Sequence, residues 1–198
     1  MSDSGTARSD GTEPRRRLFL ALWPDEALRR RLRDLLGREL PIRSGRPEPL
    51  ANLHITLVFI GSVGEDRVPA IVQAAAGVSG TAFELSLGRV GYWERPRILW
   101  LGPREVPAAL FNLVKDLRAA LEPCGVDRET RPYLPHMTLA RKVNRPPPAV
   151  RFEPLLWPVA AFSLVESVPA EGRSAYREMT RWPLRAADKP REPETLSD

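Results

Sequence analysis

Two histidines, His54 and His136, offer the clearest chemistry in this chain, which contains no other histidine. Each stands two residues before a threonine: residues 53–57 read Leu-His-Ile-Thr-Leu, and residues 135–139 read Pro-His-Met-Thr-Leu. A single short motif often matches by chance, but a repeat around both histidines carries a low risk of a false match. The repeat predicts two similar halves, each with an imidazole and a hydroxyl.

Strand geometry gives this spacing a chemical meaning, because residues two positions apart project from the same face of a strand. His54 is therefore expected to point with Thr56, and His136 with Thr138. If the halves face each other about an approximate two-fold axis, the two pairs line one cleft. One imidazole can then act as base and the other as acid without a metal, while the hydroxyls donate hydrogen bonds to phosphate oxygens.

Other interpretations of these residues stay open. Two half-buried structural histidines beside strand-favouring threonines would give the same pattern. A metal site on both histidines is a second alternative, although no third ligand stands at a recognisable spacing. A binding module that holds a nucleotide or an RNA end is a third, although passive phosphate binding gains little from two groups that titrate near pH 7.

Basic and aromatic side chains near the motifs are further candidates for the site. Arg141 follows the second histidine by five residues, and a guanidinium is always charged and can bind phosphate in a bidentate manner. Arg145 follows closely, so a solvated charge run is the alternative interpretation of Arg141. Tyr92, Trp93 and Phe59 are candidates for stacking on a terminal base, and the sequence does not choose among them.

The elements that position these residues follow from hydrophobic periodicity and from turn signals. Strands are expected over residues 17–23, 52–60, 83–90, 98–101, 136–140, 162–168 and 176–184. Helices are expected after Pro24, over residues 65–76, and along the apolar stripe from Val106 to Leu121. The resulting order, β-α-β-α-β-β-α-β-β-β, predicts a mixed α+β fold in which both motifs lie on strands.

Length and composition predict one folded unit with short tails. The chain has 198 residues and is 42% hydrophobic, which is ordinary for a domain with a real core. We expect a single bilobal domain over residues 15–185, with disordered polar tails over residues 1–14 and 186–198. The net charge of +5 favours phosphate-bearing partners, but only weakly, because 25 acidic residues accompany the 30 basic ones.

Cysteine content and hydropathy bear on the cellular compartment. The lone Cys124 excludes an internal disulfide and a thiol-rich metal cluster, and it fits a reducing cytoplasm. The first residues lack the apolar segment of a secretory signal, and no stretch approaches the apolar length of a membrane helix. We therefore expect a cytoplasmic protein without a membrane partner.

These residues resemble the two-histidine (2H) phosphoesterase superfamily, whose mark is a duplicated His-x-Thr/Ser-x motif with x usually hydrophobic. The closer resemblance is to the bacterial and archaeal RNA 2′,3′-cyclic phosphodiesterases, long called 2′-5′ RNA ligases. It covers nearly all of residues 17–184 and is most evident in four segments: 17–22, 52–57, 100–102 and 131–141. The last segment is the most specific.

The resemblance implies an α+β fold in which two antiparallel sheets, in a bilobal pseudo-two-fold arrangement, line a central cleft with helices outside. It implies hydrolysis of a 2′,3′-cyclic phosphate to a 2′-phosphate at an RNA end, tRNA-derived ends included, without metal or cofactor. His54 would donate a proton to the leaving 3′ oxygen, and His136 would activate water. The remaining residues implied to hold the phosphate are Thr56, Thr138 and Arg141.

A related substrate remains an alternative, because fold-level likeness does not determine the substrate. ADP-ribose 1″,2″-cyclic phosphate or a cyclic nucleotide would suit the same motifs. We expect the protein to be a monomer.

Overall fold

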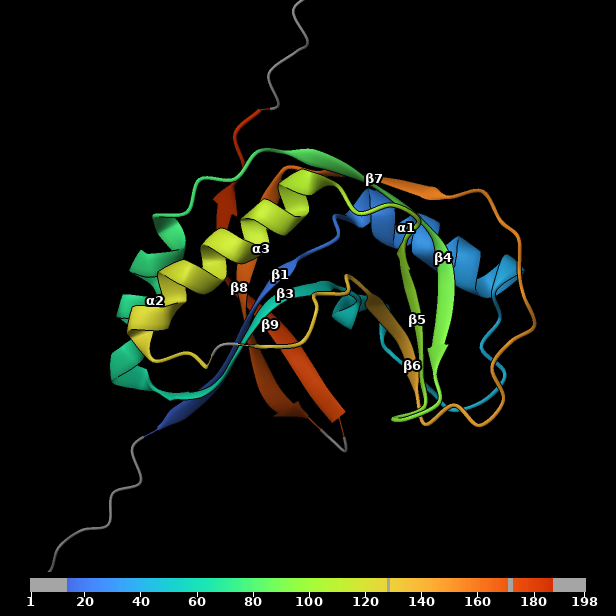
Figure 1. Ribbon diagram of the computed structural model, residues 1–198. Helices are drawn as coiled ribbons and strands as arrows, with labels where there is room; N and C mark the ends of the chain where they lie inside the picture. Colours follow the sequence, from blue (N-terminus) through green and yellow to red (C-terminus); the bar gives the residue numbers. More distant parts are fainter. Residues whose placement is uncertain (1–13, 128, 171–172, 187–198) are drawn as a thin grey trace, which may run out of the picture.

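A computed structural model of the protein describes residues 14–127, 129–170 and 173–186 (Figure 1). The disordered tails predicted over residues 1–14 and 186–198 lie, apart from Pro14 and Ala186, outside the described residues. The assignment of residues 15–185 to one domain stays a prediction.

Strands dominate the described part of the chain, and three α-helices of nine or more residues accompany them. The strands are β1 (Arg15–Leu22), β2 (Arg46–Pro47), β3 (Ile55–Gly64), β4 (Phe83–Trp93), β5 (Ile98–Pro103), β6 (Met137–Arg141), β7 (Leu155–Val159), β8 (Ala161–Ala170) and β9 (Arg173–Pro183). The helices are α1 (Glu26–Asp34), α2 (Val68–Ala76) and α3 (Ala108–Leu121). Short turns are η1 (Leu35–Glu39, π-helical) and the 3-10 turns η2 (Leu50–Asn52), η3 (Glu65–Arg67) and η4 (Glu122–Cys124).

The strands form a curled antiparallel sheet in the order β7-β4-β5-β6-β3-β1-β8-β9, with β2 paired to β6 beside this path. Four strands stand on each side of its centre, so β3, β1, β8 and β9 correspond to β6, β5, β4 and β7 about a pseudo-two-fold axis. At that centre, β3 and β6 share one registered pair, Ile55 opposite Met137. The expected α+β class is confirmed, and the two expected antiparallel sheets are the halves of this continuous sheet.

The helices cover the outer face of the sheet (Figure 1). Asp25 caps α1, because its carboxylate accepts a hydrogen bond from the backbone N–H of Leu28 at 2.8 Å. This helix packs against β7 of the other half, where Arg31 donates to the carbonyl of Leu156. The expected long helix is present as α3, which begins after Pro107. No helix within the described ranges is long and apolar enough to cross a membrane.

Two strands were absent from the order expected from the sequence. In β7, residues Leu155, Trp157 and Val159 are buried, while Leu156 and Pro158 are exposed. Proline cannot donate to a strand ladder and so weakens the signal of a strand, but β7 stands at the edge of the sheet, where one side of the strand has no neighbour. The other strand, β2, spans only two residues, too few for a periodic signal.

Candidate active site

The two motifs meet at the central pair of the sheet. Ile55 and Met137 are fully buried, and their side chains face the main core under the helices. His54 and His136 each come directly before one of these paired residues. Because successive residues of a strand project to opposite faces, both histidines turn away from that core.

Antiparallel pairing of β3 with β6 places the histidine of each motif copy beside the threonine of the other copy. The register sets His54 beside Thr138 and Thr56 beside His136, since the strands run in opposite directions from the central pair. These four residues and Arg141 line one cleft of about 660 Å³ between the halves. All five residues expected at the site therefore share one cavity.

A β-bulge follows the threonine in each copy. Thr56 and Val58, two positions apart, pair with adjacent residues of β1, so Leu57 is the extra residue. Thr138 and Ala140 pair in the same way with adjacent residues of β5, which leaves Leu139 extra. Bulges bend a strand and re-aim neighbouring side chains, and they are frequent beside active sites. The final hydrophobic position of each motif is thus a bulge residue whose side chain is buried.

His54 is held by hydrogen bonds on both ring nitrogens. Its Nδ1–H donates to the backbone carbonyl of Asn52 at 2.6 Å, because a carbonyl can only accept. The hydroxyl of Thr56 lies 3.2 Å from Nε2 and donates to it in this tautomer. The side chain of Asn52 in turn donates to the carbonyl of Ser174 at 2.8 Å, which links the histidine to β9.

Aromatic rings enclose His54 and change its acidity. The rings and their centroid distances are Phe19 at 4.8 Å, Tyr176 at 5.0 Å and Trp23 at 5.7 Å. Burial is the main cause that lowers the pKa of His54 to about 4, and the nearby charges of His136 and Arg141 lower it further. At pH 7, His54 is therefore neutral in the ligand-free cleft.

His136 has a similar anchor but a more open setting. Its Nδ1–H donates to the carbonyl of Leu134 at 2.9 Å, and Trp93 packs edge to face against its ring at 4.5 Å. Burial lowers the pKa of His136 as well, with a contribution from Arg141, but less strongly than for His54. In both copies Nδ1 is engaged by a carbonyl two residues earlier, which makes Nε2 the candidate nitrogen for proton transfer. At His54 this nitrogen also lies beside the Thr56 hydroxyl.

The Trp93 ring also packs against the ring of Trp100, with 5.5 Å between the two centroids. Trp100 crosses directly over Gly91 of β4, where any Cβ atom would collide with the indole. A Cβ on Gly102 would likewise come within 2.9 Å of the carbonyl of Pro135, the residue before the second histidine. Gly91 thus leaves room for the Trp100 ring that contacts Trp93, and Gly102 leaves room for the backbone that precedes His136.

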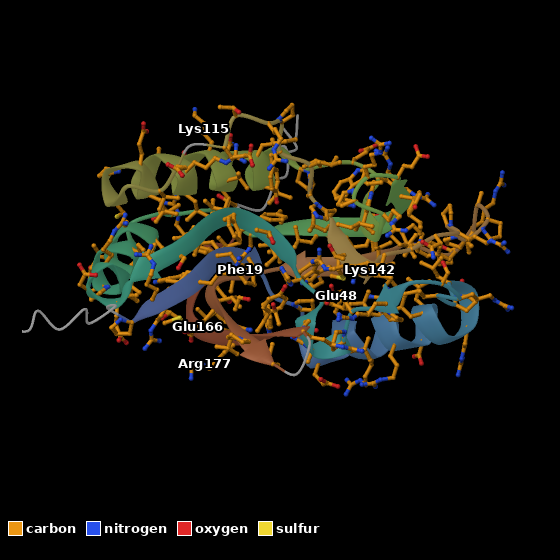
Figure 2. The ribbon with its side chains drawn as sticks, turned by 90° about the horizontal axis from the view of Figure 1, so that it is seen from below. Phe19, Glu48, Lys115, Lys142, Glu166 and Arg177 are labelled. Carbon is orange, nitrogen blue, oxygen red and sulfur yellow. The ribbon has the colours of Figure 1, made fainter. Side chains whose placement is uncertain are left out.

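Arg141 lies in the cleft as expected and is held there by an ion pair. Its Nε–H donates to the Glu48 carboxylate at 2.5 Å. Burial, followed by the charge of Glu48, raises the pKa of Tyr176. Figure 2 shows Glu48 and Phe19 towards the middle of the molecule. By contrast, Arg145 borders a different cavity, formed with residues 41–44 and 146–148.

The three aromatic candidates for base stacking have separate positions. Phe59 lines the cleft and is 54% exposed. Trp93 packs on His136 at the border of an adjoining cavity that shares Phe59 with the cleft. Tyr92 donates its hydroxyl to the carbonyl of Val143 at 2.7 Å and does not line the cleft.

Several residues of the site gave no signal in the sequence. They come from strands or loops in which an aromatic or polar residue is ordinary, and only the fold brings them to the histidines. These residues are Phe19, Trp23, Glu48, Asn52 and Tyr176. Across the described segments, no three His, Cys, Asp or Glu side chains gather as a metal-binding group.

Comparison with known proteins places this geometry in context. A family model described as the 2′-5′ RNA ligase superfamily matches residues 23–168. The RNA 2′,3′-cyclic phosphodiesterase of Escherichia coli is 33% identical over 177 residues, which cover 87% of this chain and 98% of that protein. The protein of the same name from Thermus thermophilus is 31% identical and covers 85% of this chain and 90% of its own length. The crystal structure of E. coli LigT complexed with 3′-AMP superposes with a TM-score of 0.79 at 31% identity, over 86% of this chain and 99% of the other.

Proposed function

The chain belongs to the 2′-5′ RNA ligase superfamily, and from this premise we propose that it is an RNA 2′,3′-cyclic phosphodiesterase. One observation carries the proposal at the level of the residues. The central strand pairing crosses two His/Thr copies over a single cleft, so two imidazoles and two hydroxyls line one cavity. Such a cleft suits the hydrolysis of a terminal 2′,3′-cyclic phosphate to a 2′-phosphate.

In the proposed reaction, water attacks phosphorus while the bond to the 3′ oxygen breaks. His136 accepts the proton of the water through Nε2, and His54 donates a proton to the leaving 3′ oxygen. The carbonyl acceptors on Nδ1 support these roles, because they orient both rings and keep Nε2 available. No metal takes part in this scheme.

The pKa values of the two histidines bear on which imidazole donates the proton to the leaving oxygen. In the ligand-free cleft the pKa of His54 is lowered more than that of His136, which by itself favours the reverse assignment of roles. Substrate binding raises both pKa values, since a cyclic phosphate carries a negative charge and an adjacent anion raises the pKa of an imidazole. In the proposed scheme, His54 takes up its proton as the substrate binds.

Three further side chains are proposed to hold the substrate phosphate: Thr56, Thr138 and Arg141. The hydroxyls can donate to its non-bridging oxygens, where charge accumulates. The guanidinium is supported in this role by Glu48, which engages Nε and so limits the orientations of the group. The exposed ring of Phe59 is the proposed stacking surface for the terminal base, because it is the one sequence candidate that lines this cleft.

The experiment that tests the proposal uses a short RNA that ends in a 2′,3′-cyclic phosphate, incubated with the protein in EDTA. We expect a product with a 2′-phosphate, identified by mapping the terminal phosphate. ADP-ribose 1″,2″-cyclic phosphate serves as the competing substrate. Faster turnover of that compound, a 3′-phosphate product, or binding of RNA without hydrolysis would each contradict the proposal.

A further inference from the structure

The catalytic cleft continues along β1, away from the two histidines. Ala21 pairs with Thr56 beside the catalytic centre, and Arg17 stands four residues earlier on the same strand. Residues i and i+4 of a strand share a face, and four residues span about 13 Å. Arg17 lines the same cleft, as does Phe19 between them. The cleft therefore reaches well beyond the atoms of a single cyclic phosphate.

This extension of the cleft carries positive charge. Arg17 lies over the face of Phe59, with 5.1 Å between the guanidinium carbon and the ring centroid. Arg173, the first residue of β9, lines the same cavity. Glu48 is the one acidic residue among the described residues that line the cleft, and it is paired with Arg141. Within the described residues, neither Arg17 nor Arg173 forms an ion pair with a carboxylate.

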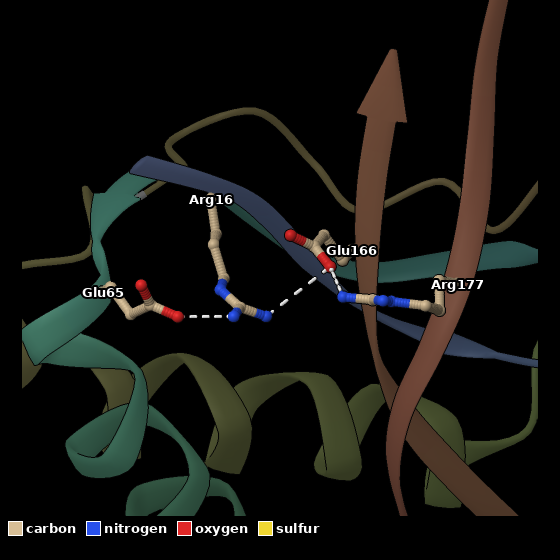
Figure 3. A network of polar contacts seen from close by, with 4 residues as sticks. All are labelled: Arg16, Glu65, Glu166 and Arg177. Carbon is tan, nitrogen blue, oxygen red and sulfur yellow. Dashed lines mark hydrogen bonds and ion pairs between the residues drawn. The ribbon is translucent and has the colours of Figure 1, made fainter. Parts of the chain in front are cut away.

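Two arginines on the same strands have a different setting. Figure 3 shows Arg16 between Glu65 and Glu166, and Arg177 bound to the same Glu166. Arg16 is adjacent to Arg17 in β1, so its side chain projects from the opposite face of the sheet. These cations are neutralised by carboxylates outside the cleft. Among the described residues, Arg17 and Arg173 line the cleft and form no ion pair with a carboxylate, whereas neither Glu65 nor Glu166 lines it.

We propose that Arg17 and Arg173 bind backbone phosphates of the RNA strand that precedes the terminal nucleotide. The inference rests on the proposed function and adds to it the means by which the site distinguishes RNA from a free cyclic nucleotide. The cyclic phosphate occupies the 2′,3′ edge of the terminal ribose, and the strand continues from its C5′ atom, so a polynucleotide needs a second, anion-binding region. Guanidinium groups without a carboxylate partner suit that role, because they can bind phosphate in a bidentate manner.

The test compares two ligands that share the same reactive end. One is uridine 2′,3′-cyclic phosphate with a free 5′-hydroxyl, and the other is a uridine trinucleotide with the same cyclic end and two internucleotide phosphates. Each phosphate contact on a single strand contributes about 0.7 to the slope of log affinity against log salt. With both contacts made, the trinucleotide slope should exceed the mononucleotide slope by about 1.4. Affinity is measured by titration calorimetry in the His136→Ala variant, so that neither ligand is consumed.

Substitution then assigns the excess slope to residues. Arg17→Gln and Arg173→Gln, made in the same background, should each reduce the excess by about half, since each removes one phosphate contact. Arg16→Gln and Arg177→Gln are the matched controls on the same strands and should retain the full excess. Circular dichroism melts verify that each variant is folded.

Two outcomes overturn the inference. One is an equal salt slope for both ligands in the parent protein, and the other is an excess that survives both cleft substitutions. Failure of the proposed function is a separate result, because it is read from turnover of the cyclic end by the protein with both histidines intact. An enzyme that hydrolyses both ligands but shows no excess slope would retain the function and lose only the strand-binding arginines.

Discussion

The two copies of the motif share a sequence pattern but differ in their surroundings. His54 is enclosed by aromatic rings from β1, β9 and the segment after β1, and its pKa is lowered to about 4. His136 rests against the edge of Trp93, and its pKa is lowered less. A duplicated motif supplies two like groups, but general acid–base catalysis needs one donor and one acceptor. The different packing of the copies makes the two imidazoles chemically unequal.

The largest effect is expected from removal of either imidazole. His54→Ala and His136→Ala should each lower kcat on a cyclic-phosphate RNA by about 10²–10⁴-fold, the usual contribution of a general acid or base. The double variant should be little worse than either single one, because the two groups act as a unit. Initial rates run beside circular dichroism melts check this. Near-native activity in a folded variant would remove that histidine from the mechanism.

The pH profiles of the same variants decide which copy plays which role. The wild-type rate should follow a bell-shaped profile, with one limb from the deprotonated base and one from the protonated acid. Loss of the low-pH limb in His136→Ala and of the high-pH limb in His54→Ala would support the proposed assignment. The opposite pattern would exchange the roles and would mean that the order of pKa values in the empty cleft persists in the complex.

A smaller loss is expected from Arg141→Ala. A charge-assisted hydrogen bond contributes about 1.5–3 kcal/mol, which corresponds to roughly a 10- to 100-fold decrease in kcat/KM. Arg145→Ala is the matched control, because this residue follows closely in sequence but borders another cavity. Steady-state kinetics of both variants measure the contrast. Equal and small effects would show that Arg141 belongs to a solvated charge run.

The difference between the histidines should also appear in stability. The pKa of His54 is about 4 in the folded protein and about 6.5 when unfolded, so between these values the unfolded chain binds more protons. Stability from this group is therefore complete above pH 6.5 and is lost as pH falls towards 4. Between pH 7 and pH 5 the loss should be about 1–2 kcal/mol.

Urea unfolding of the wild type and of the His54→Asn and His136→Asn variants, at pH 7 and pH 5, measures that loss of stability. His54→Asn should reduce the pH dependence of the unfolding free energy more than His136→Asn does, because its pKa is displaced further in the wild type. Equal changes in the two variants would show that the two copies are not as unequal as their packing indicates.

The smallest expected effect is that of metal removal. In the proposed scheme the two imidazoles transfer both protons, and threonine and arginine side chains stabilise charge, so EDTA should leave turnover unchanged. Initial rates before and after exhaustive chelation check this, with re-addition of a divalent ion as the control. Loss of turnover that the ion restores would favour a metal bridging the two copies.

Local pattern was enough to pair the candidate catalytic groups. A strand places residues two apart on one face whatever the rest of the fold does, so His54 with Thr56 and His136 with Thr138 could be paired from the sequence. The apolar stripe of α3 could be predicted for the same reason, since its period is a property of the helix itself. The edge strand β7 could not, because whether a proline is tolerated there depends on which neighbour the strand lacks.

What made the two copies unequal was decided only by tertiary structure. Tyr176 comes from β9, more than a hundred residues after His54, yet its ring lies 5.0 Å from the imidazole. Desolvation depends on every segment that excludes water from a group, and those segments share no local pattern. The crossing of the motifs likewise depends on the register of Ile55 with Met137, which is a choice of partner between distant strands. The sequence by itself therefore determined which side chains are candidates for the chemistry, and the packing of remote segments decided how acidic each histidine is.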